Sequence, residues 1–160
     1  MPAGEEDSAE ASAAKRYFYY YGPKLNRRIE SPLNSRLNYG YAIIRNSIIK
    51  ALYSTGLNPA IGLHHTNQYN AFNLADDLIE PFRPMTDLLA LSSQSDNIRL
   101  DYRDRRKMAA VMRLSVKMRN HKMQLARAVE MEVDSLLSAI KDGKDLNLPQ
   151  ILPLEIMEME

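Results

Sequence analysis

The sequence predicts an all-α domain built as a multi-helix bundle, and three observations favour that fold class. Apolar residues recur at spacings of three and four over several segments, as on the buried face of an amphipathic helix. Ser, Asn, Pro and Gly stand where such segments begin and end. No alternation of apolar and polar residues lasts long enough to predict a sheet. The length of 160 residues suits one domain with a single core.

The first clear helix is predicted to begin at Ser31 and Pro32, an N-cap residue followed by proline at the first helical position. Gly56 marks its expected end. Residues 57–72 contain Pro, Gly and several Asn without helical periodicity, so they are expected to form a connection. The apolar positions that define the helix are Leu33, Leu37, Tyr41, Ile44, Ile48 and Leu52.

Shorter helices are expected to follow the connection. Asn73 is predicted to cap a helix that Pro84 breaks or kinks, and residues 84–93 are predicted to form a further short helix. Residues 92–97 are expected to be a loop because they are rich in Ser, Asn and Asp.

Two longer helices are predicted at 101–118 and 121–141, with Gly143 as the stop. The C-terminal segment, which contains two prolines and apolar residues, is expected to pack in extended form before fraying. The acidic residues 1–9 are expected to be disordered, and residues 155–160 are expected to form a flexible tail.

Composition excludes several classes of protein. The chain has no Cys, which excludes a disulfide scaffold, thiolate zinc sites and a cysteine nucleophile, and favours a reducing compartment. The acidic N-terminus has no apolar signal region, and no stretch approaches about 18 consecutive apolar residues. We therefore expect a cytoplasmic protein that does not interact with a membrane.

The formal net charge of +1 is unlike that of most nucleic-acid-binding proteins, but the charges are unevenly placed. Residues 15–53 carry +7 and residues 99–127 carry +8, and acidic segments offset both. A polyanion responds to the local field of a patch and not to the sum over the molecule. Arg103 and Arg106, in the denser basic segment, are therefore candidate DNA-binding residues.

Three carboxylates lie close together at Asp76, Asp77 and Glu80, where helical spacing brings them onto neighbouring positions. Like charges at this spacing repel, so some compensation is expected. A basic partner such as Arg83, or solvent, would suffice. Alternatively, the carboxylates could hold a divalent cation. His64 and His65 lie in the preceding loop, and an imidazole from either one would suit Mn²⁺ better than Ca²⁺. Spacing alone leaves both alternatives open, and a solvated acidic face is the more common case.

Three runs of this sequence, in this order, carry a resemblance to a known family. They are EASAAKRYF at 10–18, SPLNSRLNYGYAIIRNSIIKAL at 31–52 and GLHHTNQYNAFNLADDLIEPFRP at 62–84. The chain resembles the CRISPR-associated integrase and endonuclease, the Cas-one family, in the form that accompanies type II systems. The resemblance implies an antiviral defence protein that inserts new spacers into CRISPR arrays.

In that family a divalent ion is bound by a Glu on an early helix, a His in a later loop and an acidic residue on the next helix. The resemblance assigns these roles to Glu10, His65 and Glu80, with Mg²⁺ or Mn²⁺ as the cofactor. Asp77 matches a further acidic position of the motif, and Asp76 is expected to support the site or to face solvent. The family usually has Gly after the first Glu, whereas Ala11 follows Glu10 here.

The resemblance also implies an activity and partners. A DNA 3′-hydroxyl attacks a phosphodiester at the repeat boundary, in a reaction that joins protospacer DNA to the CRISPR repeat. The small Cas-two protein is the expected partner, and the full-length family forms a homodimer. Besides the two arginines named above, candidate phosphate contacts are Lys15, Arg16, Arg36 and Arg83.

Family members carry an N-terminal β-rich domain that has no counterpart in this sequence. We therefore expect residues 10–154 to form the helical metal-dependent catalytic domain alone. One alternative is a catalytically silent fragment that binds DNA or partner helices through its basic and aromatic faces. Another is a purely structural helical bundle whose acidic face meets solvent.

Overall fold

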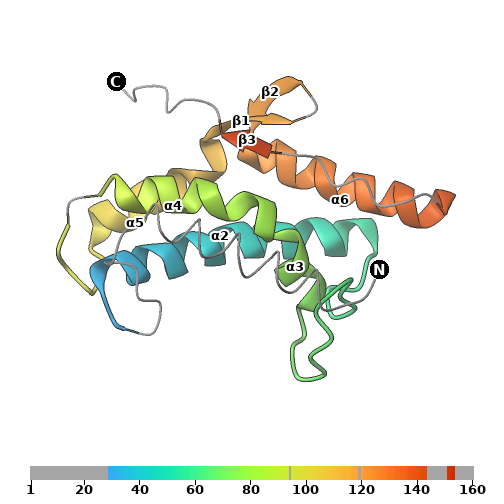
Figure 1. Ribbon diagram of the computed structural model, residues 1–160, viewed down its shortest axis with the longest axis horizontal. Helices are drawn as coiled ribbons and strands as arrows, with labels where there is room; N and C mark the ends of the chain where they lie inside the picture. Colours follow the sequence, from blue (N-terminus) through green and yellow to red (C-terminus); the bar gives the residue numbers. More distant parts are fainter. Residues whose placement is uncertain (1–28, 94, 119, 144–150, 154–160) are drawn as a thin grey trace, which may run out of the picture.

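The computed structural model describes residues 29–93, 95–118, 120–143 and the strand at 151–153. Within these residues the fold is organised around one long helix, α2, which spans Pro32–Thr55 and runs through the middle of the molecule in Figure 1. Four other helices contact α2: α3 (Asn73–Leu78), α4 (Arg83–Leu91), α5 (Tyr102–Ala109) and α6 (Leu125–Asp142). The predicted helical class is confirmed.

Both predicted ends of α2 are confirmed. The Ser31 side chain accepts a hydrogen bond from the Asn34 N–H at 3.1 Å, as an N-cap residue does. Gly56 ends the helix in the left-handed conformation, with φ of 80°. Between these ends, Ile44, Ile48 and Leu52 are fully buried, so the predicted apolar face is the face that enters the core.

The helices approach most closely where α2, α4 and α5 meet. A Cβ atom at Gly40 on α2 would lie 2.5 Å from Cγ2 of Thr86 on α4 and 2.8 Å from Cε of Met108 on α5. Thr86 and Met108 are both fully buried. The absence of a side chain at Gly40 therefore sets how closely these three helices pack.

The structure corrects the predicted helices at 101–118 and 121–141. The helix α5 ends at Ala109, a 3₁₀ turn (η2, Ala110–Arg113) follows, and the chain then forms a hairpin. Strand β1 (Ser115–Met118) lies between β2 (His121–Gln124) and β3 (Ile151–Pro153) and is antiparallel to both. The helix α6 begins only at Leu125.

The burial pattern of β1 shows why residues 115–118 form a strand and not the predicted helix. Val116 and Met118 are fully buried and alternate with half-buried Ser115 and Lys117, which is the two-residue period of a strand. Asn120 in the turn has φ of 67°, a left-handed conformation that Asn tolerates better than most residues. Lys117 therefore lies on a strand and not on the helix predicted for residues 101–118.

The C-terminal segment was predicted to pack in extended form, and the strand β3 confirms this for residues 151–153. The limits proposed for disordered and flexible segments, at 1–9 and 155–160, lie outside the described residues. Among the helices that the structure describes, none is long and apolar enough to cross a membrane.

Candidate functional site

The candidate site lies where the 57–72 connection meets α3, and Asn73 fastens these two parts together. Its side-chain amide donates hydrogen bonds to the carbonyl oxygens of Ala60, at 3.1 Å, and Asn67, at 2.8 Å. The prediction that Asn73 caps α3 was wrong. A cap accepts a hydrogen bond from the helix that follows, whereas this side chain donates to the loop that precedes it.

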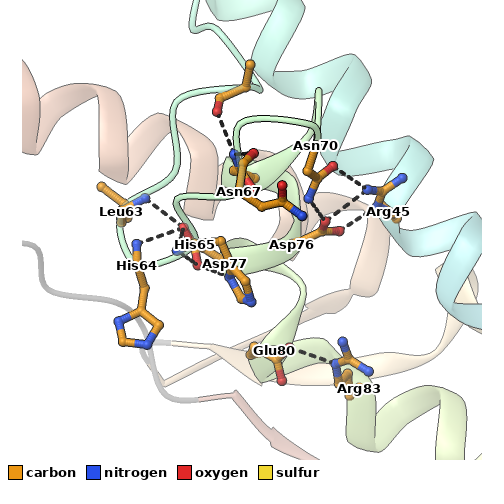
Figure 2. A network of polar contacts seen from close by, with 12 residues as sticks. Arg45, Leu63, His64, His65, Asn67, Asn70, Asp76, Asp77, Glu80 and Arg83 are labelled. Atoms are coloured by element: carbon orange, nitrogen blue, oxygen red, sulfur yellow. Dashed lines mark hydrogen bonds and ion pairs between the residues drawn. The ribbon is translucent and has the colours of Figure 1, made fainter.

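The Asp77 carboxylate organises the part of the loop that contains the two histidines (Figure 2). It accepts hydrogen bonds from the backbone N–H groups of Leu63 at 2.6 Å, His64 at 3.0 Å and His65 at 3.2 Å. It also contacts Nδ1 of the His65 ring at 2.5 Å. Only 8% of the Asp77 side chain is exposed. One carboxylate of α3 thus fixes both the backbone and the ring of His65.

Close packing at Gly62 allows the loop to turn around Asp77. A Cβ atom at this position would lie 2.2 Å from the His65 carbonyl oxygen and 3.0 Å from Oδ2 of Asp77. The first of these distances is too short for any side chain. The loop can therefore hold His65 in this position only because residue 62 is glycine.

The electrostatics of the pair follow from these contacts. Burial acts to raise the pKa of Asp77, but the hydrogen bonds from His64, His65 and Leu63 outweigh it, and the net pKa is lowered. The hydrogen bond to Asp77 raises the pKa of His65, and the negative charges of Asp77, Asp76 and Glu80 add to that effect. Asp77 is therefore an anion that favours a protonated or metal-bound partner.

The orientation of His65 suits a metal ligand. An ionised carboxylate can only accept hydrogen bonds, so Nδ1 carries the proton that Asp77 accepts, and Nε2 of the neutral ring has the free lone pair. Histidines that bind metals typically donate their other ring N–H to a carboxylate in this way. The His65 side chain is 48% exposed, so a ligand can reach it. Nε2 of His65 is therefore an atom that could bind a divalent cation.

Asp76, which was expected to support the site or to face solvent, is held by α2. Arg45 forms two hydrogen bonds to the Asp76 carboxylate, from Nε at 2.5 Å and from Nη2 at 2.9 Å, and Asn70 donates a third at 2.7 Å. Burial acts to raise the pKa of Asp76, but these bonds outweigh it and lower the pKa. The sequence analysis missed Arg45 and Asn70, because an ion pair across 31 residues leaves no local spacing signal.

Glu80 stands at the start of the 3₁₀ turn η1 (Glu80–Phe82), below the His65 and Asp77 pair in Figure 2. Its carboxylate pairs with Nε of Arg83 at 2.9 Å. The guanidinium of Arg83 also lies over the Tyr41 ring, 4.9 Å from its centre. The basic partner that the sequence offered as one alternative is therefore present.

The described residues alone do not bring three predicted ligands together. Within 29–93, 95–118 and 120–143, no group of three or more His, Asp or Glu side chains is arranged to hold a metal ion. His65 and Asp77 are joined, and the charge of Glu80 acts on His65. Glu10, the remaining predicted ligand, lies outside the described residues, as do Lys15 and Arg16.

The arginines predicted to bind DNA differ in their surroundings. Arg36 is only 5% exposed and donates hydrogen bonds to the carbonyl oxygens of Ala90 and Ser95, at 3.1 and 2.6 Å. The predicted phosphate contact at Arg36 is therefore corrected to a structural role, because its guanidinium holds the end of α4 and the following loop. Arg103 and Arg106 are exposed on α5, and Arg83 is half-buried.

Comparisons with known proteins point to one family. The family model described as "CRISPR associated protein Cas1" matches residues 7–129. The CRISPR-associated endonuclease Cas1 of Neisseria meningitidis is 34% identical over 165 residues, covering 99% of this chain and 54% of the relative. A Cas1 endonuclease of Pyrobaculum aerophilum is 31% identical over 113 residues, covering 65% of this chain and 38% of the relative.

A solved structure is also similar. It is described as "Casposase bound to integration product" and matches with a TM-score of 0.62 and 25% identity, over 80% of this chain and 41% of that one. The chain spans about half the length of the Neisseria meningitidis relative. Because the family model covers most of the sequence and agrees with these relatives, the chain belongs to the Cas1 family.

Proposed function

We propose that this chain supplies the metal-dependent catalytic part of a DNA endonuclease and integrase of CRISPR spacer acquisition. The observation that carries the proposal is the His65 ring. Its Nδ1 is fixed by the buried Asp77 carboxylate, and its Nε2 is left for a ligand. The names of the relatives, CRISPR-associated endonucleases, support the same activity.

In this proposal Glu10, His65 and Glu80 hold Mg²⁺ or Mn²⁺. When bound, such an ion neutralises charge on a phosphodiester and lowers the pKa of an attacking hydroxyl. Two of the described residues, Asp77 and Arg83, support this site. Asp77 keeps the proton on Nδ1 of His65 and so sets the tautomer. Arg83 places a positive charge next to Glu80, where the substrate phosphate is expected.

The proposed reaction is a transesterification. A DNA 3′-hydroxyl attacks a phosphodiester of the CRISPR repeat, a new phosphorus–oxygen bond forms, and the displaced 3′-oxygen leaves with a proton. Water in place of the hydroxyl gives strand cleavage. The similar casposase structure, described as bound to an integration product, supports strand transfer on this fold. Protospacer and repeat DNA, the Cas-two protein and a homodimer of the full-length protein remain predicted partners.

A strand-cleavage and strand-transfer assay with Mn²⁺ tests the proposal. We expect His65→Ala and Glu80→Gln each to lower the rate by at least about 100-fold, because each removes a metal ligand. His64→Ala is the matched control. His64 is the exposed neighbour of His65, and its only hydrogen bond to Asp77 comes from the backbone, which alanine retains.

Two outcomes would contradict the proposal. Activity that survives in both His65→Ala and Glu80→Gln would show that the ligands are elsewhere. DNA binding that falls with salt but responds neither to Mn²⁺ nor to the loss of Glu80 would instead favour the catalytically silent fragment.

A further inference from the structure

The 57–72 connection presents apolar side chains to solvent immediately beside the candidate site. Tyr69 is 89% exposed, and Ile61 and Leu63 are exposed on the same loop. None of these side chains enters the core. Leu63 directly precedes the two histidines, and its backbone N–H is held by Asp77. Tyr69 has the most exposed of the large apolar side chains that the structure describes, and it lies on the loop that also carries the candidate metal ligand.

The loop around Tyr69 is held by hydrogen bonds on both sides. The Asn67 side chain accepts the N–H of Tyr69 at 3.0 Å, and its carbonyl oxygen accepts the N–H of Asn70, also at 3.0 Å. The same carbonyl accepts the Asn73 amide of α3, and the Asn70 side chain accepts the N–H of Phe72. Tyr69 is thus displayed from a fixed backbone, which lowers the entropy cost of binding through it.

The 57–72 connection carries no negative charge that would repel an anionic ligand. Residues 57–72 contain no Asp, Glu, Lys or Arg. The carboxylates that follow are already paired, Asp76 with Arg45 and Asp77 with the loop itself. A phosphate backbone can therefore approach Tyr69 without meeting an unpaired carboxylate of this loop.

The exposed apolar surface is too small for a protein partner. A standard protein interface buries about 800 Å² on each side, and three separate side chains cannot supply that area. A single aromatic ring surrounded by Asn, Thr and Gln is instead suited to one nucleotide base, because a base stacks on the ring and its edges meet hydrogen-bonding groups.

We propose that Tyr69 stacks on an unpaired base of a single-stranded DNA end and so guides the adjoining phosphate toward His65. The proposal rests on the proposed function and adds a substrate-positioning residue to it. The Cα atoms of Tyr69 and His65 are at most about 14 Å apart, the reach of four residues, so both would act on the same short stretch of strand. Stacking does not depend on base identity, so Tyr69 would select single-stranded over paired ends without reading sequence.

The test measures DNA binding in EDTA, where no metal-dependent reaction occurs. The ligands are a duplex with a 3′ single-stranded overhang that contains 2-aminopurine, and a blunt duplex of the same length. We expect Tyr69→Ala to weaken binding of the overhang DNA about 5- to 100-fold and to abolish the change in 2-aminopurine fluorescence on binding. Tyr69→Phe should retain both, because the ring is kept.

Tyr102→Ala is the matched control, because Tyr102 is 71% exposed but lies on α5, away from the loop. Equal affinity of wild type and Tyr69→Ala for the overhang would overturn the proposal. So would an equal loss of affinity for overhang and blunt DNA, or failure of the wild-type chain to bind the overhang. The proposed function fails separately, if His65→Ala and Glu80→Gln both retain activity in Mn²⁺, and that result would leave a binding defect of Tyr69→Ala in EDTA unaffected.

Discussion

At the scale of single residues, the Asp77 carboxylate holds the candidate site in place through its hydrogen bonds to the preceding loop. Its oxygens are shared between three backbone N–H groups and the His65 ring. Residue spacing placed Asp77 beside Glu80 and suggested a shared face on a helix. Its actual partners lie 12 to 14 residues earlier, in a loop without periodicity, so no spacing rule could have found them.

We expect Asp77→Asn to lower the pKa of His65 toward 6.5, because the hydrogen bond to the carboxylate and its charge raise that pKa in the native state. The raised pKa of His65 stabilises the fold fully below pH 6.5, and the lowered pKa of Asp77 stabilises it fully above pH 3.8. The variant should therefore lose most stability between these two values, and less as pH rises through the native pKa of His65. An NMR titration of the His65 ring measures the shift. Asp134→Asn, an exposed change on α6, should leave it unaltered.

Glu132 on α6 is a second unusual carboxyl group. It is 1% exposed, and neither side-chain oxygen has a hydrogen-bond partner among the described residues. Burial raises its pKa to about 8. The group is therefore largely protonated at neutral pH, and ionising it in place is costly.

This carboxyl group should make the protein less stable at alkaline pH. The native state binds the proton up to about pH 8, whereas the unfolded chain releases it near 4.5, so stability falls between these values. The slope is about 1.4 kcal/mol per pH unit. Glu132→Gln should remove that slope in chemical denaturation at several pH values. The control Glu130→Gln, exposed on the same helix, should keep it, and an unchanged slope in Glu132→Gln would refute the assignment.

At the scale of secondary structure, the predictions were correct where capping residues and apolar periodicity were clear in the sequence. Capping residues and a long apolar stripe predicted α2 correctly at both ends. The hairpin was missed because β1 and β2 have four residues each, and no Pro or Gly interrupts the sequence between them and α5. The pairing that makes β1 a strand comes in part from β3, which is distant in sequence.

The close approach of α2, α4 and α5 predicts a cost for any side chain at position 40. Gly40→Ala would press a methyl group against Cγ2 of Thr86, a stiff β-branched side chain in the core. We expect the free energy of unfolding to fall by about 1 to 3 kcal/mol in urea denaturation. Thr86→Ser removes that methyl group, so it should cost less in the Gly40→Ala background than alone. Strictly additive effects would contradict the contact.

At the scale of the whole molecule, the basic helix α5 and the 57–72 connection lie at opposite ends of α2 (Figure 1). A net charge of +1 hides this arrangement, because acidic residues elsewhere cancel the sum. Arg103 and Arg106 are exposed on α5, whereas Arg36, in the other basic segment, is used to hold the fold together. The charge that a duplex would meet thus depends on which arginines the fold leaves at the surface.

Replacing both Arg103 and Arg106 by Gln should weaken DNA binding and reduce its salt dependence. If both side chains contact phosphates, the slope of log K against log salt should become shallower by about 2. Fluorescence anisotropy at several salt concentrations measures this slope. Arg127→Gln, which changes an exposed arginine on α6 that pairs with Glu130, is the control. An unchanged slope in the double variant would place the duplex elsewhere.

The sequence alone determined the helical class, both ends of α2, the position of the connection and the residues in which a metal ligand was expected. These follow from local rules, because caps, periodicity and turn residues act within a few positions. Tertiary structure decided the partners of those residues. It joined Asp77 to His65, Asp76 to Arg45 and Arg36 to the end of α4. A carboxylate or guanidinium pairs with whatever the fold brings within hydrogen-bonding distance, and that distance is unrelated to separation along the chain.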